Sequence, residues 1–213
     1  VEFCKHNSST DWQRTMRSEI NFIEASPSSM SVFQTTIALT GAKNPLRQLM
    51  HPYLDQQPGK DADIGHEVWT NFFTRMAKSH GRSIHNFQGS VADPFQYNDF
   101  CVILKHMTLI GDHGIIWSPM SARGDILMES LGIVRPECIK FKPILWFGHP
   151  KFEWEKFFGR VLLISNRGFD VEVMLIATKT QKYLINDMRK VFSKYGIVVN
   201  LWHTSTAELQ NAV

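Results

Sequence analysis

The chain has 213 residues, of which 43% are hydrophobic and 12% aromatic, enough apolar surface for a packed core and too much for a chain disordered along its length. Its three cysteines are too few for a disulfide framework and favour a reducing compartment. The net charge of +3 is uneven: residues 135–195 carry twelve Lys or Arg and six Asp or Glu, which indicates either an acidic partner or a soluble surface that is simply uneven.

The chain begins with segments that predict strands and continues into its first helix. Residues 1–12 are polar and are expected to be loose. Residues 20–25 and 31–41 are rich in β-forming residues, and the Ser-Pro-Ser-Ser sequence between them predicts a hairpin. Residues 64–78 place their apolar side chains in one sector of a helix. The weak pattern of residues 82–99 indicates a loop.

The middle of the chain predicts a second hairpin, followed by a helix. Residues 100–110 and 115–117 are apolar, and a Gly-Asp-His-Gly tetrad separates them, which is typical of two strands joined by a tight turn. Residues 121–131 then predict a helix that begins at Ser121 and is terminated by the glycine that follows.

The last third of the chain has the clearest pattern. Residues 139–147 predict a strand, and Pro143 places it at the edge of the sheet, because proline cannot donate to a sheet ladder. The elements expected after it are a short aromatic helix or turn over 152–158, a third hairpin from 161–165 and 169–178, a helix over 181–195, a strand over 197–202, and a short helix that begins at Ser205.

These elements predict a single α+β domain over residues 1–213. The expected strands outnumber the helices and come mostly as hairpins, and strand–helix–strand units appear only near the end. We therefore expect a mainly antiparallel sheet with about four packed helices, in preference to a doubly wound parallel fold.

The helix over 181–195 carries the first candidate binding surface. Its apolar residues fill one sector, and Tyr183 falls in the opposite, polar sector. An aromatic ring among cations suits a nucleobase, because stacking contributes about 1–3 kcal/mol per base while the cations hold phosphates. An ordinary solvated helix face has the same pattern. The cations of the polar sector are Lys182, Arg189, Lys190 and Lys194.

The aromatic stretch from Trp146 to Arg160 is the second candidate surface. Lys151, Lys156 and Arg160 are interleaved there with aromatic residues, Trp154 among them. Aromatic rings beside cations can form a stacking platform for nucleic acid or a wedge in an anionic lipid surface. The same residues also suit a core in which a short helix closes over the sheet.

The acidic residues support an alternative, a metal-dependent nuclease. Asp170 and Glu172 alternate on one face of a strand, and the turn at Asp112 and His113 could approach them. Carboxylates hold Mg²⁺ or Mn²⁺, and a lysine such as Lys179 stabilises developing negative charge. The spacing argues against this alternative, because seven positions separate Glu172 from Lys179. No other metal or cofactor is expected, since the sequence has no CxxC, HExxH or Gly-rich phosphate loop.

The leading hypothesis from sequence is a non-enzymatic nucleic-acid-binding protein, with RNA as the expected partner and the basic, aromatic C-terminal half as the binding surface. A self-associating, viral-like structural protein of the shell or matrix type, which forms homo-oligomers and contacts anionic membrane, is an alternative on the same residues. No apolar run approaches the roughly 20 residues of a spanning helix, and the first residues lack the layout of a signal peptide. We therefore expect an intracellular location, cytoplasmic or nuclear.

Overall fold

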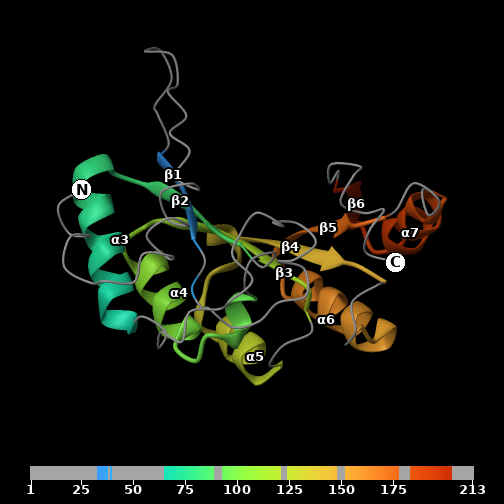
Figure 1. The fold of residues 1–213 in the computed structure, drawn as a ribbon, viewed down its shortest axis with the longest axis horizontal. Helices are drawn as coiled ribbons and strands as arrows, with labels where there is room; N and C mark the ends of the chain where they lie inside the picture. Colours follow the sequence, from blue (N-terminus) through green and yellow to red (C-terminus); the bar gives the residue numbers. More distant parts are fainter. Residues whose placement is uncertain are drawn as a thin grey trace, which may run out of the picture.

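The fold is built on one sheet whose six strands are all parallel (Figure 1). The computed structural model describes residues 33–37, 39, 65–88, 93–120, 124–147, 152–177 and 183–202. The strands are β1 (Phe33–Ile37), β2 (Ser83–Phe87), β3 (His113–Ser118), β4 (Ile139–Leu145), β5 (Asp170–Leu175) and β6 (Val198–Leu201). The helices in these ranges are α3 (His66–His80), α4 (Phe100–Leu109), α5 (Gly124–Ile133), α6 (Trp154–Asn166) and α7 (Leu184–Ser193), with short 3-10 turns at Pro94–Gln96 and Pro136–Cys138.

The expectation of a mainly antiparallel α+β fold is wrong. Neighbouring strands in the sheet are neighbours in the chain, in the order β1-β2-β3-β4-β5-β6, so every connection must cross back before the next strand begins. Such crossovers are right-handed in nearly all proteins, and a sequential order therefore places all the helices on one face. This is the arrangement of α/β barrels rather than that of doubly wound sheets, whose strand order reverses.

One helix and part of another, which were expected to be strands, explain the error. Residues 100–109 form α4, which is apolar on most sides because it packs between the sheet and its neighbouring helices α3 and α5. Residues 161–165, expected to be half of a hairpin, lie inside α6. A short apolar run fits a buried helix as well as a buried strand, so the pattern alone did not separate them.

Strand β2 lies in a segment for which the sequence predicted a loop. β2 reads Ser-Ile-His-Asn-Phe, and its polar residues are buried because they are hydrogen-bonded. His85 Nε2 lies 2.8 Å from Asp112 Oδ2, and His85 Nδ1 lies 2.8 Å from Thr35 Oγ1. The backbone N–H of Ser83 donates to the other oxygen of Asp112. This network ties together β1, β2 and the start of β3.

Pro143 does not lie at an edge as the sequence predicted, because β4 pairs with β3 on one side and with β5 on the other. The ladder with β5 accommodates the missing N–H by skipping two positions. It pairs Phe141 with Val171 and then Ile144 with Met174, while Lys142 and Pro143 have no paired residue in β5. The local break in the ladder coincides with the charged residues described below.

Three helix predictions were close to the structure. Those for residues 64–78, 121–131 and 181–195 correspond to α3, α5 and α7, and the strand predicted over 197–202 corresponds to β6. The short helix or turn predicted at 152–158 falls in the first half of α6, which is a helix. The strand predicted over 20–25 and the helix predicted from Ser205 lie outside the described residues. None of the described helices is long and apolar enough to cross a membrane.

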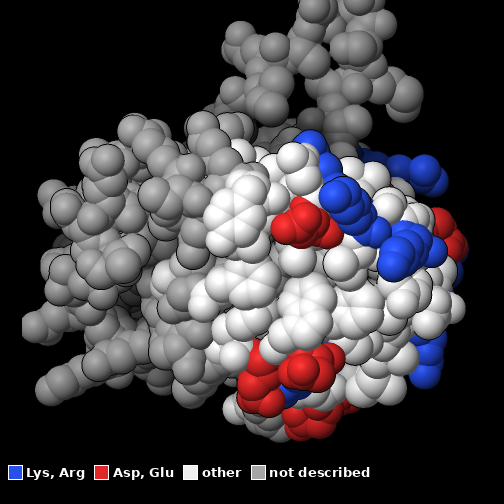
Figure 2. All heavy atoms as spheres, turned by 90° about the vertical axis from the view of Figure 1, so that its right-hand side faces the viewer, with Lys and Arg blue, Asp and Glu red and all other residues white. Residues whose placement is uncertain are grey.

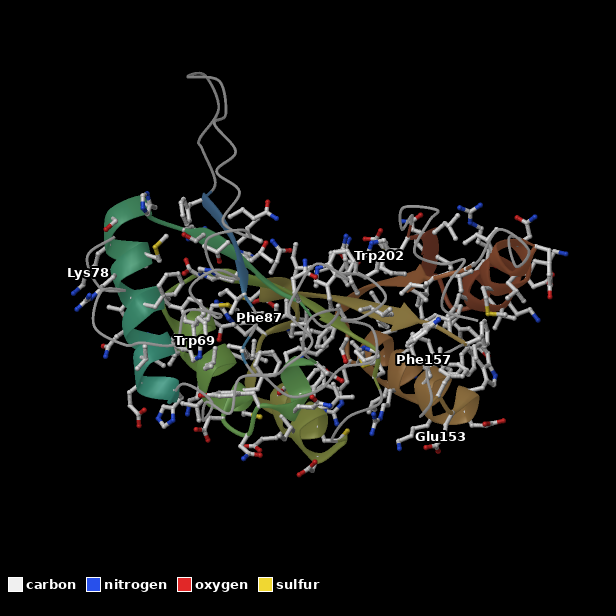
Figure 3. The ribbon with its side chains drawn as sticks, viewed as in Figure 1. Trp69, Lys78, Phe87, Glu153, Phe157 and Trp202 are labelled. Atoms are coloured by element: carbon white, nitrogen blue, oxygen red, sulfur yellow. The ribbon has the colours of Figure 1, made fainter. Side chains whose placement is uncertain are left out.

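The main core lies between the sheet and the helices, and Figure 1 shows α4, α5 and α6 below the strands. Trp69 of α3, Phe87 of β2 and Phe157 of α6 belong to this core, and Figure 3 shows how far apart along the sheet they lie. Gly114 packs closely on this side of β3, since a Cβ there would lie 2.9 Å from Ile139 Cδ1 and from Met107 Cε and would displace the ends of those side chains. The alternate residues of the strands point to the opposite side.

That opposite side is called here the helix-free face, because none of the described helices packs on it. Side chains alternate along a strand, so its members are the strand residues and strand-end residues that lie out of step with the main core. They are Asn86, Ile115, Trp117, Lys140, Lys142, Ile144, Trp146, Asp170, Glu172, Met174, Ile176, Val198, Asn200 and Trp202.

Candidate functional site

A row of alternating charges crosses the middle of the helix-free face. Lys140 Nζ lies 3.2 Å from Asp170 Oδ2 and 3.1 Å from Glu172 Oε2. Lys142 Nζ lies 3.3 Å from the same Oε2 atom of Glu172. The parallel register brings these groups together. It pairs Lys140 with Asp170, and because every second residue of a strand points to the same face, Lys142 and Glu172 then also lie side by side. The row contains two lysines and two carboxylates, so its charges cancel.

Glu172 is the centre of this row. Only 17% of its side chain is exposed, and burial alone would raise its pKa; hydrogen bonds from Lys140 and Asn200 and the charge of Lys142 outweigh burial, so the pKa of Glu172 lies below its ordinary value. Oε1 accepts a hydrogen bond from Asn200 Nδ2, while Oε2 faces both lysines. Glu172 is therefore a held, ionised group that draws β4, β5 and β6 together.

Lys140 responds to the same contacts in the opposite direction. Burial would lower the pKa of its ammonium group, but hydrogen bonds from that group to Glu172 and Asp170, together with their charges, raise the pKa above its ordinary value. Lys140 is therefore a fixed cation. Lys142 contacts one carboxylate where Lys140 contacts two.

Aromatic side chains flank the charge row toward the carboxyl ends of the strands. The rings of Trp117 and Trp202 are 4.8 Å apart and tilted by 55°, and Lys142 Nζ lies 4.6 Å from the centroid of the Trp117 ring. Beneath them Ile144 and Ile176 form a second, small hydrophobic cluster, against which Trp146 also packs. The helix-free face thus combines a charge row with an aromatic wall.

A hollow of about 530 Å³ lies at the other end of the charge row, near the amino ends of β3, β4 and β5. Its apolar lining includes Ile84, Ile115 and Pro136, and its polar lining includes His113. Lys140 and Asp170 belong to both the hollow and the row. A volume of this size falls within the roughly 300–1,000 Å³ typical of small-molecule sites. Hollow, charge row and aromatic wall are therefore one continuous surface.

The candidate surface on α7 is only partly as expected. Tyr183 is 64% exposed, and Lys190 and Lys194 are exposed as well. Arg189 is committed to the fold, because its Nε donates to the carbonyl of Val199 on β6 at 3.1 Å. Lys182 lies outside the described residues. Figure 2, which views the side of the molecule that carries α7, shows Lys and Arg atoms interrupted and bordered by Asp and Glu atoms.

The aromatic stretch is mostly core. Trp154 is partly buried, stacks on Phe158 at 5.3 Å and packs against Phe192 of α7. Arg160 is partly buried and donates to the backbone carbonyl of Met120; burial lowers the pKa of its guanidinium despite nearby Asp93. Lys156 pairs with Glu153 on the surface of α6. The core interpretation therefore describes Trp154 and Arg160 better than a binding platform does. Lys151 lies outside the described residues.

The nuclease residues come together only in part: His113 and Asp170 line the same hollow, whereas Asp112 does not. Asp170 and Glu172 share the helix-free face, as the alternation predicted, but lysines contact both. Asp112 is buried on the opposite side of the sheet with His85, while the neighbouring His113 is exposed at the hollow. Lys179 lies outside the described residues. Within the ranges that the structure covers, no group of three or more His, Cys, Asp or Glu is placed to hold a metal ion.

Sequence reasoning missed the lysines of β4 and the aromatic wall. The signal for the lysines was present, since Lys140 and Lys142 alternate with apolar residues just as Asp170 and Glu172 do. What the sequence did not supply was the parallel register that pairs these two strands. Trp117 and Trp202 lie 85 positions apart in the numbering, and only the fold brings them into contact.

Comparisons with known proteins identify a shared fold. No protein-family model matches the sequence, and no curated protein matches it. Among solved structures, the chain resembles Streptococcus suis SuiB bound to precursor peptide SuiA, with a TM-score of 0.62, 12% identity, and coverage of 81% of this chain and 40% of that chain. The fold is that of part of SuiB.

A second structure of Streptococcus suis SuiB matches with a TM-score of 0.53 and 12% identity, over 70% of this chain and 36% of that chain. The chain therefore spans less than half the length of the SuiB chains it matches. At 12% identity, these structural matches show a likeness of the fold and nothing about activity.

Proposed function

We propose that this protein binds a peptide of mixed charge along the helix-free face of its sheet. The observation that carries the proposal is the charge row of Lys140, Lys142, Asp170 and Glu172 lying between an aromatic wall and a hollow. A peptide offers both signs of charge, amide groups and apolar side chains, and each has a counterpart on this surface.

The balance of charge favours a peptide over nucleic acid on this face. A polyanion gains affinity by neutralising its phosphates with Lys and Arg, but here each lysine already faces a carboxylate within 3.3 Å. Phosphates would meet Asp170 and Glu172 as well as the lysines. A mixed-charge segment avoids this repulsion, since complementary rather than uniform charge sets specificity.

The fold neighbour adds a precedent. SuiB has been crystallised with a precursor peptide, SuiA. In α/β barrels, which share the sequential order of parallel strands, sites are built at the carboxyl ends of the strands. The aromatic wall of Trp117 and Trp202 lies toward those ends.

Isothermal calorimetry with a blocked peptide tests the proposal. The probe is acetyl-Gly-Phe-Asp-Phe-Lys-Gly-amide, and its control is a peptide in which Glu replaces the Lys, so that only the charge pattern differs. We expect a Kd below about 1 mM for the mixed-charge peptide and weaker binding of the acidic one. Equal binding of both peptides, or binding of neither, contradicts the proposal.

Two variants locate the binding. Trp202→Ala removes half of the aromatic wall and is expected to weaken peptide binding by about tenfold, the effect of losing an aromatic anchor. Tyr183→Ala, just before α7, is the matched control, because the side chain of Tyr183 is exposed and lies outside the helix-free face. If Tyr183→Ala weakens binding as much as Trp202→Ala does, the peptide is not bound on the helix-free face, and the proposal is contradicted.

Nucleic-acid binding through α7 is the second candidate function. One observation favours it: Tyr183, just before α7, is 64% exposed, and Lys190 on α7 and Lys194 just after it are exposed as well. A stacking ring beside cations suits single-stranded RNA. A salt titration of binding to labelled single-stranded RNA, with Lys190→Glu and Lys194→Glu together as the variant, tests it. Affinity that does not fall with salt, or that the variant leaves unchanged, argues against it.

A further inference from the structure

The hollow near the amino ends of β3, β4 and β5 combines an apolar lining with exposed carboxylates. Ile84, Ile115 and Pro136 line it and are all partly exposed, so apolar surface faces the open space. Glu137 and Asp170 line it as well, and each of these side chains is 65% exposed. A group that fits this hollow therefore has an apolar part to bury and a polar part that can stay in water.

Asp170 ends the charge row on the side of the hollow. Its Oδ2 lies 3.2 Å from Lys140 Nζ, and within the described ranges of the chain its Oδ1 has no ion-pair or hydrogen-bond partner. Glu172 shows that a carboxylate of this row can face two ammonium groups at once, because Lys140 and Lys142 lie 3.1 and 3.3 Å from the same oxygen. Asp170 can therefore take a second cation through Oδ1.

Glu137 supplies a second carboxylate that is only weakly engaged. Its Oε1 lies 3.5 Å from Arg135, and both side chains of this pair are exposed; such a pair contributes little to stability. The lysine that lines the hollow, Lys140, is already contacted by Asp170 and Glu172. An anion in the hollow would find this lysine neutralised and would meet carboxylates, so the hollow favours a cation.

We infer that the hollow binds a Lys or Arg side chain of the ligand, with its cation at Asp170 and Glu137. Its aliphatic stem packs against Ile84, Ile115 and Pro136. Long basic side chains bury their stems on apolar surface while the charged head remains in water, which is the combination that this hollow offers. The inference rests on the proposed function, because it names which part of the peptide the hollow recognises.

A small probe tests the hollow without a peptide. n-Butylamine is an ammonium ion at neutral pH and has the stem of a lysine side chain, and n-butanol is its neutral counterpart. The backbone amide resonances of Gly114 and Gly168 report binding, because both glycines line the hollow. We expect n-butylammonium to shift these resonances and n-butanol to shift them much less. Equal shifts with both probes, or no shift with n-butylammonium, overturn the inference.

A double-mutant cycle tests the contact of the ligand cation with Asp170. Calorimetry compares acetyl-Gly-Phe-Asp-Phe-Lys-Gly-amide with a peptide that has norleucine in place of the lysine, which keeps the stem without the charge. Norleucine and Asp170→Asn are each expected to weaken binding by about fivefold, the upper end for an exposed ion pair. Groups in contact are not additive, so Asp170→Asn should leave binding of the norleucine peptide nearly unchanged. Additive effects overturn the inference.

Two further variants separate a contact in the hollow from the overall charge of the protein. Glu137→Gln is expected to weaken binding of the lysine peptide by about twofold. Glu153→Gln is the matched control, because Glu153 lies just before α6, outside the hollow, is 63% exposed and pairs with Lys156 at 3.3 Å. If Glu153→Gln weakens binding as much as Asp170→Asn does, the inference is overturned.

The same experiments distinguish failure of this inference from failure of the proposed function. If both peptides bind equally well and Trp202→Ala still weakens them, the peptide site stands and the role of the hollow is refuted. If n-butylammonium binds in the hollow but no peptide binds, the cation site stands and the peptide function is refuted.

Discussion

Replacing Glu172 by Gln removes the carboxylate that lies between two lysines on the helix-free face. Lys140 and Lys142 then face each other without the oxygen that both approach, at 3.1 and 3.3 Å. Hydrogen bonds to charged groups contribute about 1.5–3 kcal/mol each when partly buried, and Gln retains part of them. We therefore expect the free energy of unfolding to fall by about 2 kcal/mol at neutral pH, which lowers the melting temperature by about 4–8 °C in a domain of this size.

The pH dependence of this effect has a definite sign. The pKa of Glu172 is lowered in the folded protein, so its contribution is fully present above its unfolded pKa of about 4.3 and is lost as the pH falls through the folded pKa. The difference in the free energy of unfolding between the unaltered protein and Glu172→Gln should therefore shrink as the pH falls below about 4.3.

Glu137→Gln is the matched control for this variant. Glu137 is in an exposed pair with Arg135 at 3.5 Å, and the loss of such a pair costs about 0–1 kcal/mol. Thermal melts followed by circular dichroism from neutral to acidic pH compare the three proteins. The reasoning is refuted if Glu172→Gln is no more destabilising than Glu137→Gln, or if its effect does not diminish toward acidic pH.

Asp112→Ala should destabilise the protein by about 3 kcal/mol or more, because it leaves buried His85 and the Ser83 N–H without their partner; His113→Ala, at the exposed next position, should stay within about 0.5 kcal/mol, and chemical denaturation distinguishes the two. Phe87→Ala should cost about 3–5 kcal/mol, since Phe87 is fully buried in the main core, whereas Leu109→Ala should be close to neutral because Leu109 is 75% exposed; equal denaturation midpoints for these two variants would refute the assignment of the core. Lys140→Met should lose its destabilising effect above the ordinary lysine pKa of about 10.4, because the pKa of Lys140 is raised in the fold and its contribution disappears as the pH rises through that value.

The sequence predicted α3 and α7 because the apolar residues of each helix lie in one continuous sector. It did not separate α4 from a strand, since residues 100–109 are apolar on nearly every side. The glycines added to the error. Gly111 and Gly168 both have positive φ, and each was expected to form a hairpin turn, whereas in the fold each lies in the short connection from a helix to the next strand. A helix terminus and a hairpin use the same residue for the same conformational reason.

The candidate site was predictable strand by strand but not as a whole. The alternation of Asp170 and Glu172 placed them correctly on one face, and the exposure of Tyr183 was expected. The contacts of Glu172 with Lys140 and Lys142 depend on a parallel register between strands that are not joined by a turn. The packing of Trp117 against Trp202 depends on the whole sheet. Local pattern carries no information about such pairings.

The indole resonances of the six tryptophans test the account most directly. Trp117, Trp146 and Trp202 lie on the helix-free face, whereas Trp69 and Trp154 lie with the helices. With the indole nitrogens labelled, titration of acetyl-Gly-Phe-Asp-Phe-Lys-Gly-amide should shift the first three signals and leave those of Trp69 and Trp154 in place. Shifts confined to Trp69 or Trp154, or no shifts at saturating peptide, would contradict a peptide site on the helix-free face.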